Sequence, residues 1–318
     1  MALTTLADVI VPSIFDNYVQ NLTAELSEFV QSGIAQNSPD IQVPEGGSRV
    51  HVPHWNDIAN LDDEIRIVDT ALTPAEITAG EQVAVILRRA KAFKASDLAA
   101  ELAGSDPMGA IARRVAAFQV RNEQKVLLSI LAGLDAASAL SELDISGETP
   151  PADIIDADAF VDATQVLGDA SPSLTTFAVH SATEAYLRKQ DLIDYLPDST
   201  RSVQIATYQG RRLIIDDGLP VSSGVYTSYL FGAGAFARAN GRPRIPVEVE
   251  REALKHNEQI VVRRDYILHP RGYAWGGAAA SDAAPSPSNA VLATGANWTR
   301  VYDPKRIPIV KFVHKIGA

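Results

Sequence analysis

The chain has 318 residues, of which 46% are hydrophobic and 21% are charged, values typical of folded globular proteins. This length accommodates one large domain or two modest ones. The sequence contains no cysteine, which excludes disulfide frameworks, thiolate nucleophiles, iron-sulfur clusters and cysteine-rich zinc sites. Because it has neither a basic signal-peptide region nor an apolar run long enough to span a bilayer, we expect neither secretion nor membrane insertion.

The net charge of -11 is distributed unevenly along the chain. Residues 1–87 hold thirteen acidic side chains but only two basic ones, Arg49 and Arg66, whereas the remaining residues are neutral overall. The last stretch has the opposite sign, because a single acid, Asp303, accompanies five basic residues: Arg300, Lys305, Arg306, Lys311 and Lys315. An acidic front and a basic end would attract each other between neighbouring copies of the chain. Solvated charges that keep the protein soluble explain the pattern equally well.

The first predicted element is an amphipathic helix that begins after Pro12, with Ser13 as its N-cap, and ends at Gly33. Apolar residues recur in it at three- or four-residue spacing, at Ile14, Tyr18, Leu22, Leu26 and Phe29. Such a helix must pack against this subunit or against another one.

Residues 37–87 show the alternation of β-strands, as at Val50 and Val52 and again at Val83 and Val85. Turn sequences separate the alternating stretches, and large apolar residues are few. We therefore predict a long two-stranded excursion with little core of its own, which would be marginal unless another surface braced it.

A long helix follows. Asp106 and Pro107 form a strong helix start, and Gly133 is a plausible stop. The apolar periodicity between them predicts an amphipathic helix of about 26 residues, roughly 39 Å long, which is longer than most globular helices. We interpret it as a structural spine.

The remainder alternates predicted helices and strands and indicates an α+β fold. Helices are expected at 158–167 and 182–193, and strands at 175–179, 213–215, 226–231, 247–250, 259–268 and 307–313. Residues 276–289 are rich in Gly, Ala, Ser and Pro and predict an exposed loop.

Two patterns could be taken for enzyme chemistry. Gly232, Gly234 and Ala237 match a loose dinucleotide-binding fingerprint after a predicted strand, but no clear helix follows, so we favour small residues packing in a strand and turn over nucleotide binding. Asp216 and Asp217 precede Gly218 and are typical of a turn rather than of acid-base catalysis.

His51, His54 and Asp57 are of residue types that can bind a metal. The two histidines fall on opposite faces of a strand, so we interpret them as hydrogen-bonded or exposed side chains and not as metal ligands. We therefore predict no catalytic, cofactor-binding or metal-binding residues.

The basic cluster Arg88, Arg89, Lys91 and Lys94 lacks the interleaved aromatics suited to nucleic-acid stacking. It favours pairing with acidic surfaces, with structural ion pairs or a solvated face as the alternative.

Four segments in chain order resemble the major capsid proteins of tailed bacteriophages, and together they cover nearly the whole chain. They are TLADVIVPSIFDNYVQ at the start, HVPHWND around Trp55, the stretch from ALTPAEITAGEQ through KVLLSILAG at residues 71–133, and NWTRVYDPKRIPIVKFVHKIG at the end. The resemblance implies the fold named for the Hong Kong coliphage. Carried onto this chain, it implies an N-terminal arm (1–35), an extended loop (36–90), a peripheral domain (91–150) with a spine helix (107–132), an axial domain (151–245) and a return to the peripheral domain with a C-terminal strand (246–318).

The resemblance also implies function through self-association, as the icosahedral shell of pentamers and hexamers that encloses double-stranded DNA, with no catalysis. The acidic excursion would lie over a neighbouring subunit. The candidate contact residues are Asp62, Asp63, Glu64, Arg88, Arg89, Lys91, Lys94, Lys305, Arg306 and Lys311. An encapsulin-like compartment is the close alternative, and a nucleotide-binding enzyme is a remote one.

Further partners follow from the same resemblance. They are a portal, a separate scaffolding protein or none, and a possible decoration protein, with assembly in the bacterial host cytoplasm and residence in the virion. Net acidity predicts only weak, non-specific contact with packaged DNA. Some relatives form covalent cross-links through a loop lysine. Since no lysine occurs before Lys91, we expect no such bond here.

Overall fold

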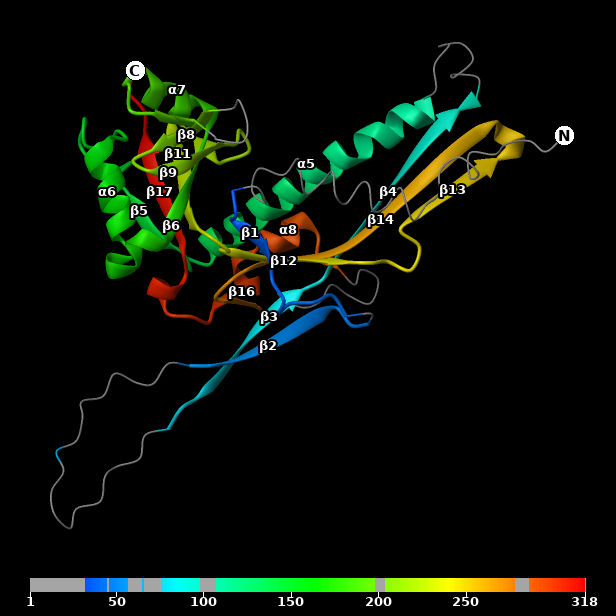
Figure 1. Cartoon of the computed structure of the whole chain (residues 1–318), viewed down its shortest axis with the longest axis horizontal. Coiled ribbons are helices and arrows are strands. Elements are labelled where there is room, and N and C mark those ends of the chain that lie inside the picture. Colours follow the sequence, from blue (N-terminus) through cyan, green and yellow to red (C-terminus); the bar gives the residue numbers. More distant parts are fainter. Residues whose placement is uncertain are drawn as a thin grey trace.

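Two β-sheets joined by a long helix organise the part of the chain that the computed structural model describes, residues 32–44, 46–56, 65, 76–97, 107–197, 204–277 and 286–317 (Figure 1). Helix α5 (Pro107–Ala136) starts beside the first sheet and ends beside the second. The mixture of helices and largely antiparallel sheets is the predicted α+β class.

The first sheet carries the outer half of α5. Its central strand is β14 (Asn257–Pro270), which pairs along one edge with β4 (Leu87–Ser96) and along the other with β13 (Val247–Glu252) and β12 (Phe236–Gly241). Strand β1 (Ala35–Asn37) adds to β12 in parallel. The predicted basic cluster, Arg88, Arg89, Lys91 and Lys94, lies within strand β4. Leu87, which is fully buried, pairs with Tyr266.

The second sheet has eight strands within the described residues. In order they are β5 (Ser141–Asp144), β17 (Ile309–Lys315), β11 (Val225–Gly232), β6 (Leu174–Val179), β9 (Arg211–Ile215), β8 (Gln204–Tyr208) and β7 (Asp194–Pro197), with β10 (Val221–Ser222) paired to β11. Helices α6 (Ala157–Gln165) and α7 (Ser181–Lys189) complete this part. Phe160 of α6 packs edge-to-face on Phe177 and Tyr208 at 4.8 and 4.6 Å, which ties the helix to the sheet.

The last strand of the chain, β17, lies in the second sheet and not beside β14. Strand β17 runs between β11 and β5. Ile309 packs toward α5, whereas Val310 and Phe312 enter the core under α6 and α7. A strand that is buried on both faces belongs in the interior of a sheet.

Helix α5 continues one turn beyond its predicted end at residue 132, and Gly133 lies inside it. A Cβ atom on Gly133 would lie 2.2 Å from the carbonyl oxygen of Leu292 and 2.7 Å from Nε1 of Trp298. The glycine therefore permits the close approach of α8 (Asn289–Leu292) and does not stop the helix.

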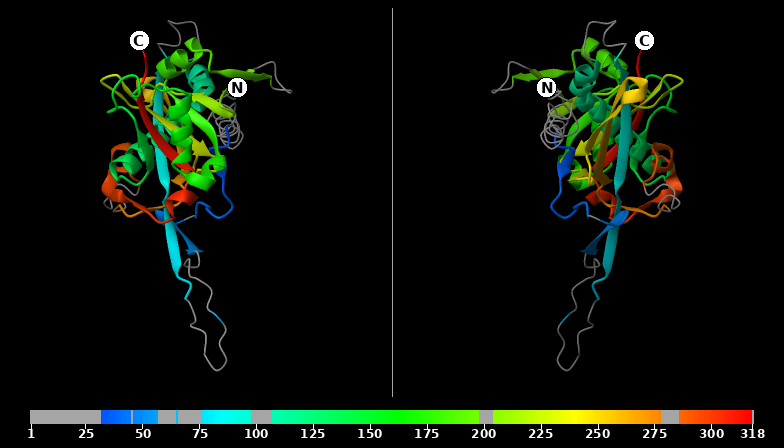
Figure 2. Two further views of the ribbon diagram at one scale, coloured as in Figure 1. Left: turned by 90° about the vertical axis from the view of Figure 1, so that its left-hand side faces the viewer. Right: turned by 90° about the vertical axis from the view of Figure 1, so that its right-hand side faces the viewer.

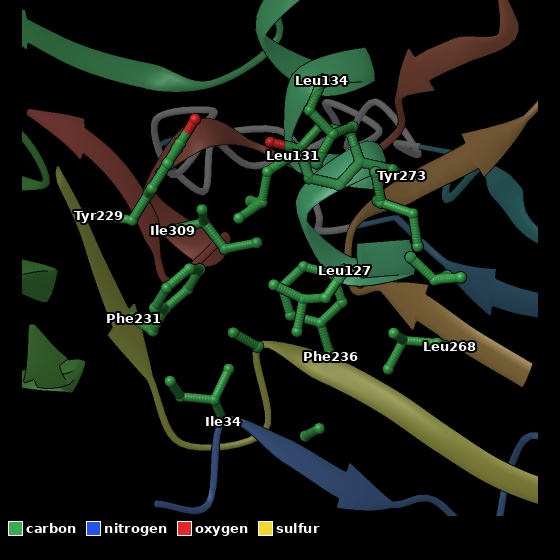
Figure 3. Packing of buried hydrophobic residues seen from close by; sticks show 14 of the residues in the cluster. Ile34, Leu127, Leu131, Leu134, Tyr229, Phe231, Phe236, Leu268, Tyr273 and Ile309 are labelled. Carbon is green, nitrogen blue, oxygen red and sulfur yellow. The ribbon is translucent and has the colours of Figure 1, made fainter. Parts of the chain in front are cut away.

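One hydrophobic core connects the two sheets (Figure 3). The last turns of α5 contribute Leu127, Leu131 and Leu134. The first sheet contributes Phe236 and Leu268, and the second contributes Tyr229, Phe231 and Ile309. Ile34, just before β1, is fully buried in the same cluster. The two sheets are therefore packed together as one body and are not separate domains on a hinge.

A two-stranded ribbon, β2 (Arg49–Trp55) and β3 (Ala79–Val85), leaves this body (Figure 2). Among the described strands, β2 and β3 pair only with each other. The ribbon coincides with the excursion predicted at 37–87. The predicted first helix and the acidic triplet at 62–64 lie outside the described residues.

Candidate inter-subunit surfaces

The ribbon is fixed to the body at its base by apolar packing and by a buried side chain. Val50, Val52 and Ala84 cluster with Ala237 and Ile267 of the first sheet. Gln82 of β3 accepts a hydrogen bond from the backbone N–H of Gly272 at 3.1 Å and donates one to the hydroxyl of Tyr302. Arg49 of β2 donates to the carbonyl oxygen of Gly277. Because a buried amide that satisfies both its donor and its acceptor tolerates little movement, Gln82 helps to hold the base of the ribbon in place.

The outer end of the ribbon is apolar and exposed. Trp55 is 68% exposed and Ile77 is 50% exposed, and both lie at the end farther from Gln82. A two-stranded ribbon is marginally stable by itself. Exposed large apolar side chains on such a ribbon are typical of a surface that another molecule covers.

Most basic side chains of strand β4 have polar partners within the subunit. Arg88 donates to Gly47 and lies 3.9 Å from Asp265, Arg89 donates to Asn289 at 3.1 Å, and Lys94 donates to Glu252 at 2.8 Å. The exposed side chain of Lys91 has no polar partner among the described residues. Structural pairing therefore accounts for much of this cluster, and Lys91 keeps its charge available.

The basic C-terminal stretch is neutralised within the chain more than its sequence suggests. Lys311 donates to Asp135 at 2.7 Å and to Glu142 at 2.9 Å, and only 12% of its side chain is exposed. Burial lowers the pKa of Lys311, but its hydrogen bonds and charge interactions with these two carboxylates outweigh burial and raise it. Lys305 donates to Asp169 at 3.0 Å, while Arg306 is exposed. The C-terminal lysines therefore have acidic neighbours besides Asp303, because the fold brings carboxylates from distant parts of the chain beside Lys305 and Lys311.

A buried ionic cluster that sequence reasoning missed joins α5 to the first sheet. Glu123 accepts from Arg238 of β12 at 2.7 Å and from Arg264 of β14 at 2.8 Å. Burial alone would raise the pKa of Glu123, but Arg264 and Arg238 outweigh it and hold that pKa below its ordinary value. The position of Glu123 three and four residues before the apolar Val126 and Leu127 could have revealed it, since that spacing places a charge on the buried face.

The dinucleotide fingerprint is not a nucleotide site. Gly232 ends β11 and Ala237 lies in β12, so the motif links two strands and no helix presents its N-terminus. A Cβ atom on Gly232 would lie 2.5 Å from Cβ of Pro308, and Gly234 has a φ of +68°. Close packing and a tight turn explain both glycines.

The other polar candidates take part in local structure. His51 lies 3.2 Å from Glu81 on the exposed face of the ribbon, while His54 packs edge-to-face on Tyr302; Asp57 lies outside the described residues. Among the residues with described positions there is no group of three potential metal ligands.

Asp216 accepts from the N–H of Gly218 at 2.8 Å, as expected of a turn. Asp217 accepts from Ser181 at 3.3 Å. No helix in the described ranges has the length and apolar character needed to cross a membrane.

Solved structures that match this architecture include phage capsids and the capsid of a GTA particle. The head of Helicobacter pylori bacteriophage KHP40 matches with a TM-score of 0.57 and 8% identity over 92% of this chain and 91% of that one. The capsid of Ralstonia phage GP4 matches with a TM-score of 0.56 and 10% identity over 92% of each. The capsid of an empty GTA particle matches with a TM-score of 0.55 and 16% identity over 92% and 90%. The fold is therefore that of a tailed-phage capsid protein.

Sequence comparison gives the family. The model of the Gp13-like family, described as major capsid protein 13-like, matches residues 55–307. The major capsid protein of Bacillus phage SPP1 is 43% identical over 331 aligned residues that span all of both chains. The chain belongs to the Gp13-like family of major capsid proteins, and its function is that of a major capsid protein of a tailed phage.

Proposed function

We propose that copies of this chain build a closed icosahedral shell of pentamers and hexamers around double-stranded DNA, with the β2–β3 ribbon as a main inter-subunit contact. The observation that carries the proposal is the ribbon itself, which is anchored at Gln82 and bears exposed Trp55 and Ile77 at its outer end. A neighbouring copy would cover these side chains and brace the ribbon.

Charge would guide this contact. The acids Asp62, Asp63 and Glu64 belong to the segment between the two ribbon strands, and they would meet basic side chains on the neighbouring copy. Lys91 is the best-supported recipient because its charge has no partner among the described residues. Arg88, Arg89, Lys94, Lys305 and Arg306 would add to the field around the contact, whereas Lys311 would act mainly within its own subunit.

The domain assignment is part of the proposal. Residues 1–35 would form the arm, 36–90 the loop, 91–150 the peripheral domain with its spine helix, and 151–245 the axial domain. Residues 246–318 would return to the peripheral domain except for β17, which adds to the sheet of the axial domain. Copies meeting head-to-tail around an axis would form the rings.

The remaining partners follow from the same role. A portal, a separate scaffolding protein if one is used, and a possible decoration protein would contact the shell, which would assemble in the host cytoplasm. The packaged DNA would touch it only weakly, because the net charge is -11. We assign the chain no catalytic role.

Electron microscopy with size-exclusion light scattering tests the proposal directly. We expect closed shells, or rings of five and six copies, whose formation declines when Lys91 is changed to Glu. The matched control is Lys189→Glu on α7, which changes an exposed charge far from the ribbon. Shells filled with nuclease-protected DNA support a phage head, and shells filled with an enzyme cargo support a compartment. Monomers or dimers at every salt concentration and pH, even when scaffold is supplied, would contradict the proposal.

A further inference from the structure

Strands β3 and β4 form one extended stretch, separated only by Ile86, that runs from the ribbon into the first sheet (Figure 1). Each half is paired along a single side, β3 with β2 and β4 with β14. No other strand in the described ranges pairs with either of them. Each half therefore leaves one edge open, and an open edge presents backbone N–H and C=O groups to which a further strand can add.

The hydrogen-bond register identifies the open groups of β4. In an antiparallel pair, alternate residues direct both backbone groups toward the partner strand, and the residues between them direct theirs away. The N–H of Asp97 donates to the carbonyl oxygen of His256, so the odd-numbered residues of β4 face β14. The N–H of Arg88 points the other way and donates to Ser286. The outward residues without a backbone partner in the described chain are Ala90, Ala92, Lys94 and Ser96.

The same reasoning identifies the open edge of the ribbon. The N–H of Asn56 donates to the carbonyl oxygen of Thr78, so the even-numbered residues of β2 and β3 face each other. The outward residues of β2 include Pro53, which has no N–H and hinders strand addition along that edge. At the exposed outer end of β3, the outward residues are Ala79 and Glu81. The ribbon is therefore suited to extend another sheet through β3 and not through β2.

The side chains on the two open edges are compatible with close approach of β3 to β4. Ala90 and Ala92 are small and exposed, so they leave room for an added strand. Lys91 is exposed and has no polar partner among the described residues, while the exposed Glu81 lies 3.2 Å from the exposed His51. Two copies of β4 placed edge to edge would bring lysines together, whereas β3 beside β4 brings Glu81 toward Lys91, which is the favourable arrangement.

We propose that the outer end of β3 adds as a strand to the open edge of β4 in a neighbouring copy, which joins the ribbon and the first sheet into one sheet across the subunit boundary. This contact rests on the proposed function, in which the ribbon lies against a neighbouring copy. Because β3 and β4 are different surfaces of one chain, each copy donates one strand and accepts another. The contact therefore repeats head-to-tail, as a ring requires.

Engineered cysteines test which chain supplies the added strand, since the natural chain has none. Ala79→Cys is combined in turn with Ala90→Cys, Ala92→Cys and Lys94→Cys in the full-length chain. Residues 79 and 92 lie about 43 Å apart along an extended chain, so a disulfide between them joins two copies. The control combines Ala79→Cys with Ala185→Cys, an exposed alanine on α7.

After mild oxidation, peptide mass spectrometry counts the disulfides that link residue 79 to each β4 position. We expect at least one β4 position to link at least tenfold more than residue 185, with ladders of multimers on non-reducing electrophoresis. Linkage at all three β4 positions no greater than at residue 185 would overturn the inference. If wild-type shells form while this linkage is missing, the proposed function stands alone; ladders without any closed shell give the reverse.

Hydrogen exchange tests the backbone hydrogen bonds themselves. The outward amides of β4 should exchange fast in the isolated subunit, whereas those that face β14 are protected. On assembly we expect at least two of the outward amides to slow by tenfold or more. Unchanged exchange in assembled particles would show that the ribbon rests on side chains alone and would overturn the inference. Protection that appears only when scaffold is added, without linkage to residue 79, would assign the edge to a separate protein and also overturn it.

Removal of one outward N–H provides a further readout. Ala92→Pro deletes a donor that has no partner in the described subunit, so the urea midpoint should stay nearly unchanged while the yield of shells falls several-fold. Ala92→Ser retains the N–H and is the matched control. Equal shell yields from the two folded variants would contradict the strand contact. If Ala92→Pro fails to fold, the cross-links and hydrogen exchange decide.

Discussion

Glu123 and Arg238 form an ion pair at 2.7 Å in the interior, between the middle of the spine helix and strand β12. Arg264 completes the cluster from β14 and stacks on the ring of Tyr266 at 4.6 Å. Removing one member leaves charges buried without compensation, which is costlier than losing an exposed pair.

Glu123→Gln should therefore destabilise the subunit by about 3–5 kcal/mol, because Arg238 and Arg264 lose their counterion. Urea unfolding followed by circular dichroism measures the change. The matched control, Asp97→Asn, removes an ion pair to the largely exposed Arg251 and should cost less than about 1 kcal/mol. Equal losses in the two variants would contradict the role we assign to the buried cluster.

Gly133→Ala should destabilise the protein, although alanine normally favours a helix over glycine by about 1 kcal/mol. The added methyl group would overlap the carbonyl oxygen of Leu292 and displace Trp298, whose Nε1 donates to that oxygen at 2.7 Å. We expect a net loss of about 1–3 kcal/mol in thermal or urea unfolding. Gly147→Ala is the control, since its methyl group would meet no atom within 4 Å. A stabilised Gly133→Ala protein would show that α8 does not pack there.

Acid should weaken the subunit before most carboxylates titrate. Burial lowers the pKa of both His269 and His314 to about 4. His269 donates to the carbonyl oxygen of Tyr273 at 2.9 Å, and His314 pairs with Ser228 at 2.9 Å. Between pH 6.5 and 4 the unfolded chain takes up protons at these positions and the folded one does not, so stability is complete above pH 6.5 and falls toward pH 4.

The loss should reach up to about 3 kcal/mol per histidine at the low end of this range. Urea midpoints at pH 7, 6 and 5 measure it, and NMR of the two imidazoles should show neutral rings at pH 5.5. A midpoint that stays constant between pH 7 and 5 would contradict the burial of these groups.

Gln82→Ala should loosen the ribbon while leaving the two sheets intact. The substitution strands the buried N–H of Gly272, at a cost of about 1–3 kcal/mol. Hydrogen exchange should accelerate in β2 and β3 and remain unchanged in β14, and the yield of closed shells should fall. Asn56→Ala, which removes an exposed hydrogen bond to Thr78 on the same ribbon, is the control and should change neither.

Truncation should separate assembly from folding. A chain that starts at Ser32 keeps Ile34 and β1, so it should fold with unchanged stability but fail to form shells, since many weak contacts act together in a shell. A chain that starts at Ser38 loses the buried Ile34 and should be less stable by about 2–5 kcal/mol. Helicity and electron microscopy measure the two effects. Simultaneous loss of folding and assembly in the first truncation would contradict this division.

Local patterns in the sequence predicted the elements whose periodicity is strong. The spine helix begins at Pro107 as expected, and the ribbon shows the alternation of Val50 and Val52. Short strands such as β5 and β7 were not predicted. Three or four residues carry too little periodicity, and long-range pairing decides their state.

The candidate contact residues also differ in whether local sequence or only the fold determines their partners. Sequence reasoning selected Lys311 for its charge, yet its partners Asp135 and Glu142 lie far away in the chain and only the fold brings them near. Gln82 could not be found from the sequence because a single amide in a strand forms no pattern until the fold places Gly272 and Tyr302 beside it. The β17 strand was predicted, but its neighbours depend on topology rather than on local sequence.

The single core that contains Ile34, Tyr229 and Leu268 also limits how a shell of such subunits can change size. A change in the angle between the two sheets would open this core, and packed interiors do not deform continuously. Each subunit would then move as a rigid body. Any expansion or contraction of the particle would have to come from rotation of whole subunits relative to one another, which would break and remake the contacts between them.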